Sequence, residues 1–570
     1  MSKPSTHGNS GPAAEGAPAA GRRRDFLARL IALGTGTVGT GAFGSYAEAA
    51  EASQSAALKD SYDYIIVGAG SAGCLLADRL SATGASVLLI EAGTSNINQP
   101  KIAEVAYWLQ NLSSETDWAR LSTPQPHLAN RRQGAPGGKV WGGSGSINAM
   151  IWLRGDPRDY AQWCRLVGQE WNPDALNRAY LKVAQPAALD AAARHAQTGR
   201  INVGRYADSH PLTAAYLASS AATGLRTIEL NAGRPLDGVG VAEVNATADG
   251  RRSGPAQAML VPALVRPNLK VLSDTLITKL LIQGRHCRGV EAVVDNVALR
   301  INATHETIVS AGACESPKIL MLSGLGPADH LAAHGIRVQQ AMPAVGSNLQ
   351  DHMLTSVVFK SKVNLPAQVS NGVSTMAYYS TGYGQSAPDV QVAGMQYPFG
   401  ASLPAGSGYA VIAFLSKPRS RGSVRLTSAD PRQAPSIDPR YLEQGIDQDN
   451  MLLGLDRAID IGSNQGMNGI YGGRYSTASL RSRAEKLAFI AQQGGAGLHF
   501  TGTCIAGRDA STSVVDANFK VWGIERLRVV DASVIPEVPT VNIQASVLTV
   551  AQLAAERLIS EARAAGLLAQ

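Results

Sequence analysis

Three glycines, Gly68, Gly70 and Gly73, and the acidic residue Glu91 have the types and spacing that hold a dinucleotide. Gly68 would permit a tight turn, Gly70 would let the backbone approach a pyrophosphate, and Gly73 would let a helix pack closely on a sheet. The carboxylate of Glu91 could accept hydrogen bonds from ribose hydroxyls. This pattern indicates phosphate and ribose binding, and it does not separate FAD from NAD.

The flanking sequence supplies the elements that must position these residues. Residues 64–67 are a β-branched, apolar run that is typical of a buried strand, and "ASVLLIEAG" predicts a second strand that ends at Glu91. Between them, Leu75, Leu76 and Leu80 have the spacing of a helix face. Strand, glycine turn, helix, strand and acid, in this order, predict a Rossmann-like unit.

Composition limits the classes of function. The chain has 570 residues, enough for two or more domains, with a net charge of +7. Its Lys and Arg residues are scattered apart from an N-terminal cluster, which indicates a solvated surface and no nucleic-acid partner. The five cysteines lie far apart and lack the spacing of metal ligands, so we expect neither a metal site nor a disulfide framework.

Residues 1–52 are expected to be a disordered tail followed by an export signal. Arg23, Arg24 and the next three residues resemble the twin-arginine pattern, and residues 47–52 contain possible cleavage sites. The apolar region between them is short and rich in glycine, so it does not predict a spanning helix, and no other segment does. We therefore expect a periplasmic protein without an integral membrane segment; a basic amphipathic tail is the alternative.

Six later segments are considered together, because their residues and their order along the chain form one pattern. They are "GGKVWGGSGSINAMIWLRGDPRDYAQW", "SAGACESPKILMLSGLGP", "VGSNLQDH", "SRGSVRLTSADPRQAPSIDPRYL", "GLHFTGTCIAGRD" and "VVDASVIPEVPTVNIQASVL". In the second, Ser316 could cap a helix that has Pro317 at its first position. Together with the glycine turn, these blocks resemble the glucose–methanol–choline (GMC) oxidoreductases, FAD enzymes that mostly oxidise alcohols. The resemblance covers nearly the whole chain after about Asp60.

The resemblance implies an α/β (α+β) fold with two domains. A Rossmann-like FAD-binding domain would comprise residues 60–155, 240–330 and 500–565, and a substrate domain built on a large antiparallel sheet would comprise residues 156–239 and 331–499. Relatives with a histidyl flavin carry the histidine just before the second glycine loop, where this chain has Ala135 and Gly137. We therefore expect FAD to be bound non-covalently.

The resemblance also assigns cofactor contacts by position. They comprise the first glycine turn and its acid, the loop along the flavin, a backbone contact to adenine, and the C-terminal wall of the site. These residues are Gly68, Gly70, Ser71, Ala72, Gly73, Glu91, Ala92, Gly142, Gly143, Asn148, Ala149, Met150, Ile151, Ile277, Asp531, Ala532, Asn542, Ile543 and Gln544.

Of the ten histidines, His499 is the one in a family segment with an acid/base role, "LHFTGTC", in which Phe500 replaces the common proline. The other nine, His352 among them, are expected to have surface or structural roles. An alignment without gaps from Asp531 makes Asn542 the partner of His499. The alternative for Asn542 is a cap on a helix that starts near Gln544.

The implied reaction is oxidation of an alcohol to an aldehyde or ketone, with His499 taking the hydroxyl proton, Asn542 donating to the oxygen and hydride leaving for flavin N5. A hydroxynitrile lyase, a light-driven fatty-acid decarboxylase and a non-catalytic FAD protein remain alternatives. Met395, Tyr397 and Phe399 are candidates for the substrate pocket, and no acidic residue stands out as a binder for a quaternary amine. The alcohol and the electron acceptor, oxygen or a quinone or cytochrome, stay open.

Overall fold

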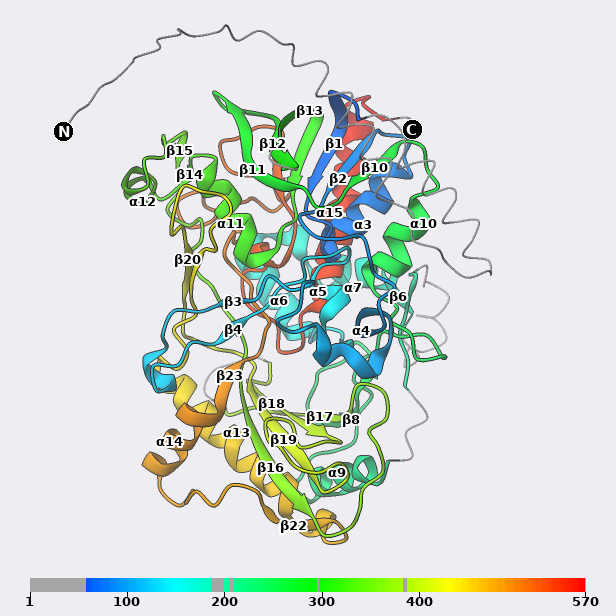
Figure 1. Ribbon diagram of the computed structural model, residues 1–570, viewed down its shortest axis with the longest axis vertical. Coiled ribbons are helices and arrows are strands. Elements are labelled where there is room, and N and C mark those ends of the chain that lie inside the picture. Colours follow the sequence, from blue (N-terminus) through cyan, green and yellow to red (C-terminus); the bar gives the residue numbers. More distant parts are fainter. Residues whose placement is uncertain (1–57, 186–198, 206–209, 295–296, 383–386, 569–570) are drawn as a thin grey trace, which may run out of the picture.

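The computed structural model describes residues 58–185, 199–205, 210–294, 297–382 and 387–568, and it places two large sheets toward opposite ends of the long axis (Figure 1). The expected export signal lies outside the described residues. Within the described part of the chain, no helix combines the length and hydropathy that crossing a bilayer requires. In the same residues no group of three His, Cys, Asp or Glu side chains is placed to hold a metal ion.

The first sheet has a parallel core. Its strand order is β10 (Leu269–Leu272), β2 (Val87–Ile90), β1 (Ser61–Val67), β13 (Val297–Val309), β12 (His286–Val294) and β11 (Leu276–Gln283), and β24 (Leu527–Val529) also pairs with β13. The β1 strand runs parallel to β2 and β13, and its residues from Tyr64 to Val67 are buried, as a central strand requires. The Rossmann-like part of the predicted fold is thus confirmed.

The second sheet is antiparallel. Its order is β22 (Tyr471–Arg474), β16 (Met353–Ser361), β19 (Gly408–Leu415), β18 (Val390–Met395), β17 (Val373–Tyr379) and β8 (Val239–Val241), and β23 (Gly494–Ala496) also pairs with β16. Strands β17, β18 and β19 are buried along their whole length, because helices cover one face and the central cavity lies against the other. The predicted large antiparallel sheet is confirmed.

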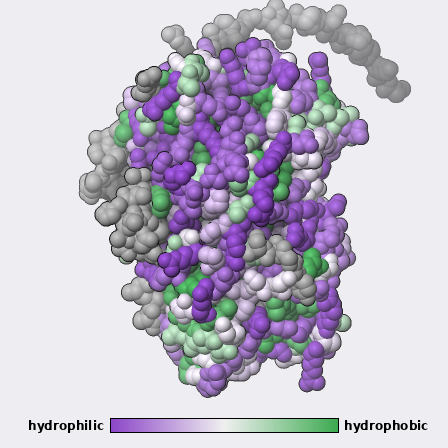
Figure 2. Space-filling view, turned by 180° about the vertical axis from the view of Figure 1, so that it is seen from behind, coloured by the Kyte–Doolittle hydropathy of each residue, from purple (hydrophilic) through white to green (hydrophobic). Residues whose placement is uncertain are grey.

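Helices join and cover the two sheets. In the cofactor half, α15 (Gln544–Ala564) packs against α3 (Ser71–Ser81) and α7 (Pro173–Leu181), and α11 (Gly312–Leu322) packs on β11. In the other half, α13 (Gly445–Ser463) covers β19, β18 and β16, with α9 (Pro211–Ala222) and α14 (Arg483–Gln493) beside it. Figure 2 shows the face opposite to that of Figure 1, where hydrophilic residues predominate and hydrophobic ones are scattered.

Shorter elements form the connections. They are α4 (Pro100–Ala103), α5 (Ser144–Ile147), α6 (Pro157–Val167), α10 (Val261–Ala263), α12 (Ala328–Ala333), and the ribbons β3–β4 (Arg120–Leu121, Gly134–Ala135), β5–β9 (Ile151–Trp152, Glu243–Val244), β6–β7 (Ala184–Gln185, Ile201–Asn202), β14–β15 (Leu325–Gly326, Gln340–Ala341) and β20–β21 (Ser423–Arg425, Ser436–Asp438).

The hydrophobic cores do not follow the predicted domain boundaries throughout. Residues 157–181 were assigned to the substrate domain, yet Trp163, Trp171 and Tyr180 belong to the same buried cluster as β1, α3 and α15. The physical reason is that the long C-terminal helix α15 covers the apolar face of α7, and α6 packs against α7 in turn. Strand β8 crosses the predicted boundary at residue 240 and joins the second sheet.

The prediction that Ser316 caps α11 is wrong. The helix begins at Gly312, so Ser316 and Pro317 lie inside it. A proline there cannot donate to the carbonyl four residues earlier, that of Ala313. The Thr503 hydroxyl donates to this carbonyl instead, at 2.6 Å. Ser316 Oγ accepts from the Ala311 amide and donates to Asp531, so distant residues stabilise the early turns.

Candidate active site

The glycine turn between β1 and α3 is built as its sequence predicts. Gly68 has φ of +99°, a conformation that favours glycine. A Cβ at residue 73 would lie 1.9 Å from the Gly68 carbonyl oxygen, so only glycine allows the helix to start this close to the strand. No side chain caps the N-terminus of α3, and Gly70, Ser71 and Ala72 line a cavity. The first amides of the helix therefore face a space that an anion can fill.

Glu91 follows β2 and lies at the same cavity. Its two carboxylate oxygens accept hydrogen bonds from the backbone amides of Ala69 (2.8 Å) and Gly93 (2.9 Å). Burial raises the pKa of Glu91 to about 7. Each oxygen keeps a second lone pair, so the bonds that fix the carboxylate still leave it able to accept from a ligand hydroxyl.

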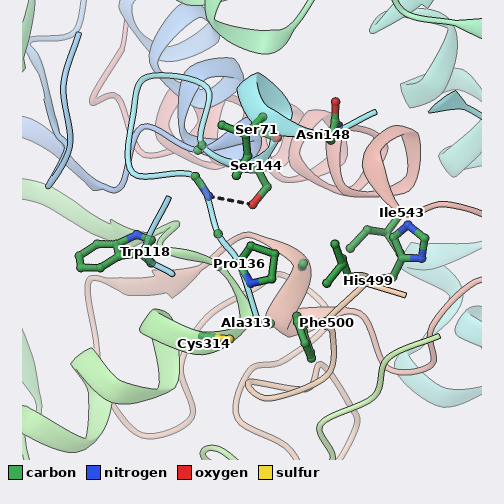
Figure 3. Close-up of a pocket in the computed structure, with 18 of the residues that line it drawn as sticks. Ser71, Trp118, Pro136, Ser144, Asn148, Ala313, Cys314, His499, Phe500 and Ile543 are labelled. Carbon is green, nitrogen blue, oxygen red and sulfur yellow. Dashed lines mark hydrogen bonds between the residues drawn. The ribbon is translucent and has the colours of Figure 1, made fainter. Parts of the chain in front are cut away.

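The cavity lies between the two sheets and has a volume of about 380 Å³. All but two of the predicted site residues line it; the exceptions are Gly73 and Gly142. Gly73 packs behind the turn, and the Gly142 amide donates to the Ala69 carbonyl at 2.7 Å, which holds the second glycine loop against the first. In the view of Figure 3, Trp118 lies at one side of the cavity and His499 at the other.

Arg252 supports the second glycine loop, a role that no motif in the sequence indicated. Its buried guanidinium donates to the carbonyls of Ile102, Gly145 and Asn148 and to Asn148 Oδ1. Burial lowers the pKa of Arg252 to about 9. With Oδ1 also accepting from the Met150 amide, the Asn148 side chain is fixed at the cavity wall.

Asp531 and Gln544, on the C-terminal side of the cavity, are each held by hydrogen bonds to distant residues. Asp531 accepts hydrogen bonds from Ser316, Ser533 and the Gly312 amide, and burial raises its pKa. Gln544, at the start of α15, accepts from Ser71 Oγ at 3.2 Å, while its buried Nε2 has no partner among the described residues. An unpaired buried amide at the open end of α3 marks a place where a ligand would accept a hydrogen bond.

His499 and Asn542 meet at this cavity. Asn542 Nδ2 lies 3.1 Å from His499 Nε2, and both residues line the space. The capping alternative for Asn542 is wrong, because α15 begins at Gln544 without a side-chain cap. Instead, Asn542 Oδ1 accepts from Gln391 Nε2 at 3.4 Å, which turns its amide nitrogen toward the imidazole. Burial lowers the pKa of His499 to about 4, so the ring is neutral near pH 7.

A second histidine lies behind the first. His352 Nδ1 is 2.9 Å from His499 Nδ1, and His352 Nε2 is 2.9 Å from the Pro539 carbonyl oxygen. Burial and the nearby His499 hold the pKa of His352 well below its usual value, so this ring is neutral as well. Its expected structural role therefore includes a contact with the other histidine, which the block "VGSNLQDH" did not reveal because the partner is 147 residues away.

Asp351 holds the backbone around His499. Its carboxylate accepts from the His499 amide (2.5 Å), from the Gly497 amide (3.2 Å) and from the Tyr441 hydroxyl. Burial raises the pKa of Asp351 to about 7. Adjacent residues of one loop thus fix both the backbone and the ring of His499.

Comparison with known proteins agrees with this fold and site. Family models for GMC oxidoreductases match residues 62–354 and 418–551. The chain is 32% identical to an alcohol dehydrogenase [acceptor] of Pseudomonas putida, over 89% of this chain and 97% of that protein. It is 33% identical to human mitochondrial choline dehydrogenase, over 93% and 95%.

A solved structure is similar over most of its length. The crystal structure of pyridoxine 4-oxidase from Mesorbium loti superposes with a TM-score of 0.83 at 32% identity, covering 88% of this chain and 99% of that one. The family models cover the glycine turn with Glu91 and the loops that carry His499 and Asn542. The chain therefore belongs to the GMC oxidoreductases, a family of FAD-dependent alcohol oxidases and dehydrogenases that act on CH–OH substrates.

Proposed function

We propose that this chain oxidises an alcohol to an aldehyde or ketone with non-covalently bound FAD, and that His499 is the general base. The observation that carries the proposal is the pair of His499 Nε2 and Asn542 Nδ2, 3.1 Å apart at the wall of the cavity. In the structure these two groups are hydrogen-bonded to each other. A hydroxyl that replaced this bond would donate to the lone pair and accept from the amide, so it could give up its proton and keep its oxygen in place.

The hydrogen bonds behind His499 support its role as a base because they specify its tautomer. The Pro539 carbonyl can only accept, so His352 carries its proton on Nε2 and presents a bare Nδ1. His499 must then donate from its own Nδ1, and its Nε2 is left without a proton. That nitrogen faces Asn542, so the neutral base is preorganised at the cavity.

The residues of the cavity fit FAD. The uncapped N-terminus of α3 and the unpaired amide of Gln544 suit a pyrophosphate, and Glu91 suits a ribose. When bound, FAD supplies the acceptor for the hydride that leaves the carbinol carbon. Asn542 holds the substrate oxygen, and His499 Nε2 takes the hydroxyl proton. As the imidazolium forms, its Nδ1–H donates a charge-assisted hydrogen bond to His352.

Non-covalent binding is supported by the surroundings of Gly137. A Cβ at this position would lie 2.1 Å from an Arg120 Nη2 atom, and Arg120 is held by Glu315 at 2.6 Å. A flavin-linking histidine there would have to displace a buried, paired guanidinium. Acid precipitation is expected to release all flavin into the supernatant, and yellow colour in the washed pellet would contradict this part of the proposal.

The test of the base is the His499→Ala variant. We expect it to retain FAD and to lower the rate of anaerobic flavin reduction by alcohol about 10²- to 10⁴-fold, the usual effect of losing a general base. Unchanged reduction would exclude His499. Reduction of the wild-type flavin by alcohol without air also separates an oxidoreductase from a lyase or a light-driven decarboxylase. Repeating the assay with oxygen, a quinone and a cytochrome would identify the electron acceptor.

Export to the periplasm is a further part of the proposal, supported by Arg23, Arg24 and the apolar stretch that follows. Replacing both arginines by lysine is expected to keep the full-length chain in the cytoplasm. Unchanged recovery from the periplasm would contradict the twin-arginine assignment.

A further inference from the structure

The antiparallel sheet presents an apolar wall to the cavity. The wall is formed by side chains of β16, β17, β18 and β19, and six of them are Leu354, Met376, Ala393, Met395, Ile412 and Phe414. Phe399, shortly after β18, extends it. The predicted pocket residues Met395 and Phe399 thus lie here, whereas Tyr397 does not line the cavity.

The strand register makes this wall continuous. Ala393 pairs with Met376 on one side and with Ile412 on the other, and Phe414 pairs with Leu354. Met376, Ala393, Ile412 and Phe414 belong to one buried hydrophobic cluster, against which Leu354 packs and which Val541 next to Asn542 also joins. Because paired residues of neighbouring strands face the same side of a sheet, their side chains form one surface that leads toward the catalytic pair.

The polar side chains on the same face lie outside the cavity lining, and among the described residues Ser374 Oγ, the Tyr378 hydroxyl and Gln391 Oε1 have no hydrogen-bond partner. Ser356 Oγ donates to the Phe399 carbonyl at 2.7 Å. Gln391 Nε2 contacts Met376 Sδ and Asn542 Oδ1. Neither residue lines the cavity. Among the described lining residues, the wall therefore offers a substrate apolar surface and no charge.

The charged residues that line the cavity, His499 aside, lie on elements of the cofactor half, and each has a partner. Arg120 and Lys318 both pair with Glu315, at 2.6 Å and 3.1 Å. Glu91 accepts from backbone amides, and Asp531 accepts from serines. None of these carboxylates is placed on the apolar wall, where it could balance a cation on the substrate.

We infer that the substrate is an uncharged alcohol with an apolar body, an inference that rests on the proposed function and specifies its substrate class. The hydroxyl lies between His499 and Asn542, and the body lies against the wall from Met376 to Phe414. Contact with this wall removes apolar surface from water, which favours binding. A quaternary ammonium such as choline would lose its hydration without an ion partner, although the relatives include choline dehydrogenases.

The test compares two alcohols of the same shape on the FAD-loaded enzyme. In 3,3-dimethylbutan-1-ol a carbon atom replaces the charged nitrogen of choline. Flavin reduction is followed anaerobically by stopped flow. We expect the ratio of reduction rate to dissociation constant to be at least about 100-fold higher for the neutral alcohol, since contacts with aromatic rings offset only part of the cost of burying a cation.

The outcomes separate the two proposals. If choline reduces the flavin as well as or better than its neutral analogue, the inference is overturned while the proposed function stands. If no alcohol in a panel of apolar, polyhydric and cationic compounds reduces the flavin, the proposed function itself fails. Along the series from ethanol to butan-1-ol, we expect about a 3- to 4-fold rise for each added CH₂, and a flat series would also overturn the inference.

Variants of neighbouring residues provide the matched control. Phe399→Ala is expected to lower the ratio for hexan-1-ol about 10-fold and the ratio for ethanol less than about 2-fold, because the short alcohol does not reach the ring. Tyr397→Phe is the control, since Tyr397 does not line the cavity and its hydroxyl has no partner in the described structure. Equal losses for both alcohols in Phe399→Ala would exclude a contact with the substrate body. If that variant does not fold, the comparison of choline with 3,3-dimethylbutan-1-ol still tests whether the substrate is uncharged.

Discussion

Replacing His352 by leucine removes the acceptor behind the catalytic base at nearly constant volume. The lost hydrogen bond joins two imidazole nitrogens 2.9 Å apart. It is a neutral bond in the resting enzyme, worth about 0.5–1.5 kcal/mol, and a charge-assisted one, worth about 1.5–3 kcal/mol, once His499 holds the proton. The difference of about 1–1.5 kcal/mol is lost only as the proton is taken, which slows that step about 5- to 12-fold.

The assay is anaerobic flavin reduction at saturating alcohol, with flavin content measured first. His352→Gln offers a carbonyl oxygen to His499 Nδ1 and should recover most of the rate. The His210→Leu variant is the control for packing, because His210 is also buried and lies 3.3 Å from a proline carbonyl, but away from the cavity. Wild-type rates in a flavin-loaded His352→Leu enzyme would refute the tautomer argument, as would an equal loss in the control.

Three further predictions test the site and its support. Because the pKa of His499 is about 4, its neutral form persists as pH falls, so the reduction rate should hold from pH 7 to about 5 and fall only as the pH approaches 4; a fall centred near 6.5 would contradict the effect of burial. Gly73→Ala forces a Cβ against the Gly68 carbonyl, so flavin content and melting temperature should both drop, whereas Gly445→Ala, which meets nothing within 4 Å, should leave both unchanged. Thr503→Val leaves the Ala313 carbonyl unpaired and should lower the free energy of unfolding by about 1–3 kcal/mol in denaturant titrations, with Thr503→Ser close to wild type.

The sequence predicted those parts of the fold that depend on neighbours in the chain. The run from β1 through Gly68 and α3 to Glu91 follows from local periodicity and the backbone freedom of glycine. The pairing of His499 with Asn542 came from family resemblance and an alignment without gaps, because no local rule connects a loop residue to one 43 positions later.

The parts that were missed depend on distant partners. The Ser316–Pro317 pair has the pattern of a helix start, but Thr503 donates to the one carbonyl that the proline leaves unpaired, and Asp531 accepts from the Ser316 hydroxyl. Likewise, Arg252 and His352 acquire their roles from residues more than 100 positions away. Helices α6 and α7 share a hydrophobic cluster with β1 and α3, which the sequence did not indicate because amphipathic spacing shows that a face is buried and not which partner covers it.

The donors from Gln391 through Asn542, His499 and His352 all point one way and end on the Pro539 carbonyl. A carbonyl oxygen has no proton to pass on, so this row of hydrogen bonds cannot carry a proton from the cavity to bulk water. A proton that His499 takes from the alcohol would therefore leave the imidazole only toward an acceptor on the side of the cavity. An electron acceptor that also takes up a proton would find that proton on His499, at the wall of the cavity.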